Sequence, residues 1–251
     1  MKKKRIWLVI FIISIIVFLI GVAGIILEIL PHKTPDLPST TDESVTQFED
    51  PRPVNPIDFS SLFEENPDIY AWIRLPGTNI DYPILQSSVE NDDYYLRRDW
   101  KKNYNRAGSI YTQRKNKKDF SDPNTLIYGH NWHDGTMFSS LLKFKDEDFF
   151  EKNRYIQVYL PGRLLTYEIY AAYLYDDRHI LLSFDFSNSE IFEKYLESTL
   201  NPTTMVKTIR EGMSLTAADR IVTLSTCPHS NISEPKRYLV QGVLIKDEET
   251  R

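Results

Sequence analysis

Cysteine is almost absent from this sequence: Cys227 is the only one among 251 residues. One cysteine cannot form a disulfide within the chain. A lone cysteine is either a small buried apolar side chain, half of an intermolecular disulfide, or a reactive thiol. The residues around Cys227 indicate which of these roles applies.

Positive charge is scarce outside the N-terminus. Four of the 30 Lys and Arg residues lie within residues 1–5, where no acidic residue is found. The rest of the chain contains 26 basic and 35 acidic residues, a formal charge of −9. Because binding to phosphates relies on a basic surface, we predict no nucleic-acid partner.

Residues 6–27 lack charge altogether and are apolar except for Ser14 and two glycines. This run exceeds the ~20 residues that a helix needs to cross a bilayer, and it predicts one membrane-spanning anchor. The basic residues 1–5 should stay in the cytoplasm, so the rest is expected outside the cell membrane. A cleaved signal peptide is the alternative. Its apolar core is typically ~7–15 residues and ends at small residues, unlike the sequence from Glu28 to Pro31.

Residues 28–56 lack apolar periodicity, and from Pro31 onward they are rich in Pro, Ser, Thr, Asp and Glu. Burial cannot offset the entropy of ordering such a segment, so an extended stalk is predicted. The folded domain is expected over residues 57–251.

Regular alternation of strands and helices is missing from that domain. Eight short runs rich in β-branched and aromatic residues predict strands at 70–75, 80–85, 108–112, 125–128, 155–160, 164–175, 220–226 and 237–245. Such a series suggests a mainly β, closed or nearly closed barrel. Helices are predicted at 136–142, at 188–200 with Ser187 and Glu190 as a capping box, and after Asn55-Pro56 as N-cap and first residue.

Cys227 follows the seventh predicted strand, so a rigid element should hold it in place. A thiol needs a nearby base or cation to become a thiolate, because its ordinary pKa is ~8.5. His130 is the best candidate base: it follows another strand end, and we expect Gly129 to let the backbone turn before it. A structural role is the alternative for His130, and His179 and His229 are weaker candidates.

His133 lies three residues after His130, and the two could share a metal ion. Neither a second cysteine nor a His-x-x-x-His helix accompanies them, so we predict no metal and no other cofactor.

Arg220 and Arg237 flank the last two predicted strands, although most arginines are solvated surface groups. If these strands pair antiparallel, Arg237 lies at the Cys227 end and Arg220 at the opposite end. A guanidinium there can stabilise an oxyanion or orient a peptide backbone through its paired donors. We therefore favour Arg237.

These residues together resemble the sortase family. The segment from Thr223 to Cys227 is similar to its Thr-Leu-x-Thr-Cys signature, and His130, Cys227 and Arg237 follow its His–Cys–Arg order. Residues 128–138, and the helix inserted before the cysteine-bearing strand, resemble class B sortases in particular. The resemblance covers roughly residues 57–246. It implies a closed eight-stranded sortase-type β-barrel with mixed and antiparallel pairing, behind a membrane anchor.

The resemblance further implies a cysteine transpeptidase of a Gram-positive cell wall. Cys227 would attack the Thr carbonyl of an Asn-Pro-x-Thr-type sorting signal near the C-terminus of a secreted protein. A peptidoglycan precursor amine would then resolve the thioester. His130 would act as general acid and base, and Arg237 would hold the oxyanion or the peptide.

By motif position, Ser225, Tyr128 and Leu96 are possible groove residues, although Leu96 could equally be core. One departure concerns His130. Class B members usually carry an acidic residue just after the cysteine, whereas Pro228 and His229 follow here. A backbone carbonyl or Asn131 would then have to orient the imidazole, unless none is needed.

Three alternatives remain. A papain-like protease places Cys before His and has a Cys-Gly-x-Cys-Trp signature, which is absent. An L,D-transpeptidase normally has Ser-x-Gly-Cys-x-Arg, also absent. A barrel on a stalk that binds peptide without catalysis would not require His130, Cys227 and Arg237 together.

Overall fold

The structure is a computed structural model that describes residues 50–228 and 236–251. The predicted membrane span at 6–27 and the candidate base His229 lie outside the described residues. Within them, no helix has the length and apolar character that crossing a membrane requires.

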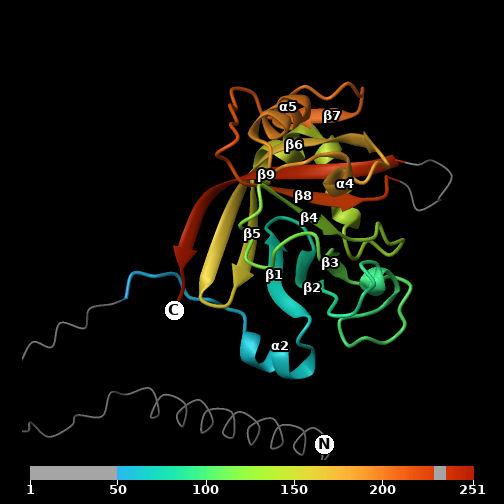
Figure 1. Cartoon of the computed structure of the whole chain (residues 1–251), viewed down its shortest axis with the longest axis vertical. Coiled ribbons are helices and arrows are strands. Elements are labelled where there is room, and N and C mark those ends of the chain that lie inside the picture. Colours follow the sequence, from blue (N-terminus) through green and yellow to red (C-terminus); the bar gives the residue numbers. More distant parts are fainter. Residues whose placement is uncertain (1–49, 229–235) are drawn as a thin grey trace, which may run out of the picture. The chain divides into compact units, whose positions relative to one another are not determined.

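Nine strands of the described chain form one sheet, and eight of them close into a barrel (Figure 1). Around the barrel the order is β1, β2, β3, β4, β8, β9, β6, β5, and β5 pairs again with β1. The β2–β3 and β4–β8 pairs are parallel and the others antiparallel. The bounds are Ile69–Leu75 (β1), Ile80–Gln86 (β2), Ile110–Thr112 (β3), Asn124–Tyr128 (β4), Tyr155–Leu160 (β5), Arg163–Asp176 (β6), Lys207–Ile209 (β7), Ile221–Thr226 (β8) and Lys236–Glu249 (β9).

The predicted closed, mixed, eight-stranded barrel is therefore confirmed. The ninth strand, β7, was not predicted. It pairs with β6 beyond the point where β5 ends. A strand of three residues is too short to show a recognisable sequence pattern.

Helices lie around the barrel at α2 (Phe59–Glu65), η1 (Tyr94–Arg97), η2 (Ser139–Lys145), α3 (Glu147–Lys152), α4 (Ile180–Ser183) and α5 (Ser189–Leu200). The helix predicted at 136–142 is wrong in position and type, because Met137 has a left-handed φ of 55° and a 3₁₀ helix starts only at Ser139. The prediction for α5 holds to within one residue.

Both predicted N-caps are wrong, one by a single residue and the other by three. Asn188, not Ser187, caps α5, and its side chain accepts from the backbone N–H groups of Glu190 and Ile191. Asp58 caps α2, while Asn55 donates its amide to the Leu160 carbonyl. Asn and Asp are equally good caps, so tertiary contacts decide which polar residue in a cluster is used.

Two cores lie on opposite faces of the sheet formed by β4, β8, β9 and β6. One fills the barrel, and the other lies between α4, α5 and the outer face of β4, β8, β9 and β6. Buried Gln241 on β9 links β8, β6 and α5 through hydrogen bonds. It donates to Thr223 on β8 and to Tyr195 on α5, and accepts from Tyr170 and Tyr173 on β6.

Replacing Gln241 by Met should lower the free energy of unfolding by about 2–4 kcal/mol, because buried hydroxyl groups lose partners. Denaturant unfolding measures this. The control is Gln157→Met on β5, because the half-buried Gln157 amide accepts only one hydrogen bond, from Tyr159. This change should alter the free energy of unfolding by less than about 0.5 kcal/mol. Equal losses in both variants would contradict a special role for Gln241.

Candidate active site

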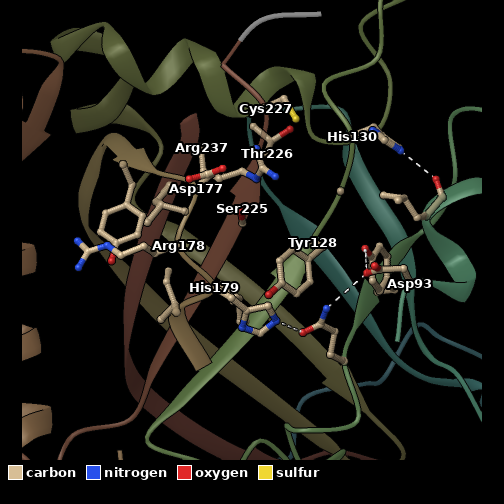
Figure 2. A pocket seen from close by; sticks show the side chains of 18 residues that line it. Asp93, Tyr128, His130, Asp177, Arg178, His179, Ser225, Thr226, Cys227 and Arg237 are labelled. Carbon is tan, nitrogen blue, oxygen red and sulfur yellow. Dashed lines mark hydrogen bonds between the residues drawn. The ribbon is translucent and has the colours of Figure 1, made fainter. Parts of the chain in front are cut away.

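Strand register brings His130, Cys227 and Arg237 side by side. Tyr128 on β4 lies opposite Ser225 on β8, and Thr226 on β8 lies opposite Tyr238 on β9. Continuing each register past the strand end places His130 and Arg237 on the two sides of Cys227, as Figure 2 shows.

The three side chains also share one face of the sheet. Side chains alternate along a strand, so Cys227 lies on the same face as Thr223 and Ser225, and His130 on the same face as Tyr128. This face carries the core under α4 and α5. The site is therefore outside the barrel, where these strands run out from beneath the helices.

Gly129 is needed because a side chain would not fit there, and not because the backbone turns. This corrects our expectation. It is not among the glycines with a positive φ. A Cβ at this position would lie 2.5 Å from Ile110 and 2.7 Å from Phe138. Glycine thus lets the backbone pass close to the barrel core just before His130.

His130 is oriented by a backbone carbonyl. Its Nε2 lies 2.9 Å from the carbonyl oxygen of Leu96 on η1. A carbonyl can only accept, so Nε2 carries a proton, and in the neutral ring Nδ1 holds the free lone pair. The Leu96 carbonyl thus orients the imidazole, a role for which the sequence has no acidic residue just after Cys227.

Arg237 is free to serve a substrate. Its Nη1 donates to the carbonyl of Lys236 at 3.0 Å, and no ion pair between described residues involves Arg237. Arg220 just before β8 is instead paired with Asp247 at 3.1 Å. The remaining guanidinium donors of Arg237 can therefore bind a carbonyl oxygen or an oxyanion.

These residues line a pocket of about 280 Å³, together with the other residues predicted for the site: Ser225, Tyr128 and Leu96. Cys227 is half-buried and forms no disulfide. Further lining residues that the sequence did not indicate come from just before η1, from β3 and the residue after it, and from the stretch between the end of β6 and the start of α4: Asp93, Tyr111, Gln113, Tyr175, Asp177, Arg178 and Ile180.

The positions of His179 and His133 decide whether either could be the base beside Cys227. His179 lines the same pocket, but Figure 2 shows it at the end away from Cys227, and its Nε2 bonds Oε1 of Gln113 at 2.6 Å. His133 is exposed, and its ring contacts that of Trp132 at a tilted angle. The described residues contain no cluster of three or more His, Cys, Asp or Glu side chains suited to a metal.

Tyr111 and Tyr128 are stacked and form an uncharged wall of the pocket. Burial raises the pKa of both Tyr111 and Tyr128 well above the usual value, and the Asp93 carboxylate adds to the effect. The Arg237 charge lowers both pKa values, but burial outweighs it. Tyr111 and Tyr128 therefore remain protonated phenols near neutral pH.

This barrel, with a thiol, an oriented imidazole and an arginine at adjacent strand ends, has the architecture of a cysteine acyltransferase. The sortase domain family matches residues 73–245. The chain belongs to the sortase family and is therefore a cysteine transpeptidase.

Curated relatives are class B members. Sortase B of Listeria monocytogenes is 37% identical over 182 residues, covering 72% of this chain and 71% of the relative. Sortase B of Staphylococcus aureus is 32% identical over 188 residues, covering 75% of each.

Solved structures agree with this assignment. Clostridium perfringens sortase B superposes with a TM-score of 0.67 at 34% identity, over 75% of this chain and all of that one. A Staphylococcus aureus sortase B–substrate complex gives 0.65 at 31%, over 75% and 84%.

Proposed function

We propose that the protein cleaves an Asn-Pro-x-Thr-type sorting signal of secreted proteins and joins the new Thr carboxyl to a cell-wall precursor amine. We also propose that residues 6–27 anchor it as a single-pass protein with residues 1–5 in the cytoplasm and the barrel outside. The juxtaposition of His130, Cys227 and Arg237 at three adjacent strand ends carries the catalytic part of the proposal.

The first half-reaction forms a thioester. The Cys227 thiolate attacks the Thr carbonyl carbon, and Arg237 stabilises the oxyanion. The C–N bond then breaks as the His130 imidazolium gives its proton to the leaving amine. Because Nε2 keeps its proton in the bond to Leu96, the transferred proton comes from Nδ1.

The second half-reaction reverses these roles. A neutral amine attacks the thioester, and Nδ1 of His130 takes its proton. The tetrahedral intermediate collapses to an amide and expels the Cys227 thiolate. Water in place of the amine would give hydrolysis, the outcome of a protease.

The test is to incubate the full-length protein with a quenched Asn-Pro-Ala-Thr-Gly peptide, with and without a short oligoglycine amine. Mass spectrometry should show cleavage after Thr and, with the amine present, a Thr–glycine amide. Cleavage elsewhere, or hydrolysis that the amine never diverts, would contradict the transpeptidation proposal.

Arg237→Lys should lower kcat/KM in this assay by roughly 100-fold, because an ammonium cannot replace the paired guanidinium donors. Arg220→Lys, a like change at the other end of β8, should stay within about twofold. Equal kcat/KM values for the Arg237→Lys variant and the parent protein would remove Arg237 from the mechanism.

A further inference from the structure

The end of the pocket away from Cys227 is built by three side chains from three separate segments. Asp93 precedes η1, Gln113 follows β3 and His179 follows β6. All three line the pocket, and Figure 2 shows His179 beyond Tyr128 as seen from Cys227.

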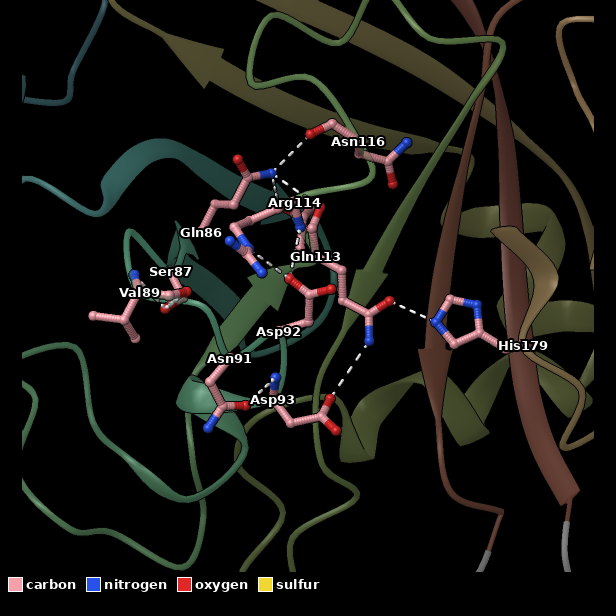
Figure 3. Close-up of polar contacts among 11 residues, drawn as sticks. Gln86, Ser87, Val89, Asn91, Asp92, Asp93, Gln113, Arg114, Asn116 and His179 are labelled. Carbon is pink, nitrogen blue, oxygen red and sulfur yellow. Dashed lines mark hydrogen bonds and ion pairs between the residues drawn. The ribbon is translucent and has the colours of Figure 1, made fainter. Parts of the chain in front are cut away.

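Two successive hydrogen bonds lead from His179 through Gln113 to Asp93 (Figure 3). Nε2 of Gln113 donates to Oδ1 of Asp93 at 3.4 Å, so Oε1 of Gln113 faces His179. Oε1 can only accept, which makes Nε2 of His179 the donor. The phenol of Tyr111 also donates to Oδ1 of Asp93, at 3.4 Å.

This end offers a ligand at least one acceptor, the Asp93 carboxylate. One N–H of Gln113, the phenol of Tyr111 and the Nε2–H of His179 are already in use, while Oδ2 of Asp93 takes part in neither bond. Asp93 forms none of the ion pairs found between described residues, whereas its neighbour Asp92 is paired with Arg114 at 3.0 Å. The Asp93 carboxylate lies exposed at the pocket rim.

We propose that Asp93 is a specificity-determining residue that binds the carboxamide N–H of the substrate residue farthest upstream of the cleaved bond. The inference rests on the proposed function and deepens it. With the Thr carbonyl at Cys227 and Arg237, the first residue of a four-residue signal lies ~10 Å away in an extended peptide, toward this end. A carboxamide satisfies an acceptor there, and a carboxylate of equal shape is repelled.

The test compares two peptides of nearly identical shape, Asn-Pro-Ala-Thr-Gly and Asp-Pro-Ala-Thr-Gly, by kcat/KM on the full-length protein. The parent protein should prefer the Asn peptide by roughly tenfold, a moderate value because Asp93 is exposed. Asp93→Asn should reduce this preference to within about twofold. The preference of the parent should also fall as salt screens the charge, and that of the variant should not.

Asp92→Asn, the same change one residue earlier, is the matched control and should leave the preference unchanged. Asp93→Ser serves as a second variant if thermal unfolding shows that Asp93→Asn is misfolded. An unchanged preference in the folded Asp93 variants overturns the inference. So does loss of the preference in Asp177→Asn instead, because Asp177 is the other pocket carboxylate.

The two proposals fail in different ways. Cleavage after Thr with a preference that ignores Asp93 overturns this inference and leaves the proposed function standing. Absence of thiol-dependent cleavage of both peptides overturns both proposals.

Discussion

Replacing Cys227 by Ala should abolish thioester formation and lower kcat/KM for the Asn-Pro-Ala-Thr-Gly peptide by at least about 10⁴-fold. No other described side chain in the pocket is a thiol, and serine and threonine hydroxyls there lack a base of their own to activate them. Removal of a nucleophile leaves only the catalysis that binding and oxyanion stabilisation supply. Turnover followed by fluorescence and mass spectrometry measures the loss.

The parent protein provides the matching positive result. Quenched early in turnover, it should carry the acyl mass on Cys227, and the alanine variant should carry none. The variant should unfold at nearly the same temperature, because the side chain is only half-buried. Cleavage after Thr that survives the alanine change would contradict the covalent mechanism.

His130→Ala should lower kcat/KM by roughly 100- to 10,000-fold, the range for loss of a general acid–base group. Both half-reactions depend on this imidazole, since one amine must gain a proton and the other must lose one. The same peptide assay in the presence of the acceptor amine measures the effect. His133→Ala is the matched control, because His133 is exposed three residues away, and it should stay within about twofold.

A metal role makes the opposite prediction for this pair. If His130 and His133 shared an ion, both alanine variants and a chelator would reduce activity together. The expected result is loss with His130→Ala alone and no effect of the chelator. Nitrogen NMR of the parent protein should further show His130 with its proton on Nε2, as the Leu96 carbonyl requires.

Local signals carried most of the fold prediction. Runs rich in β-branched and aromatic residues located eight strands of the barrel to within a few residues, because these side chains favour the pleated backbone of a sheet. Helix starts were less accurate. In the stretch from Asp185 to Asn188 several polar residues could cap α5, and packing selected Asn188.

The sequence by itself determined the three chemical groups and their neighbourhood. A lone Cys at a strand end, a His at another and an Arg on the adjoining strand needed only the strand pairing to meet. The β8–β9 pairing joins consecutive strands and could be anticipated, whereas the parallel β4–β8 pairing joins residues 97 positions apart, such as Asn124 and Ile221. The shape and charge of the pocket were decided by the tertiary structure. The Leu96 carbonyl is 34 residues from His130, and Gln113 is 66 residues from His179. No local pattern encodes such contacts, because they exist only once the barrel has closed and brought η1, the end of β3 and the end of β6 to one rim.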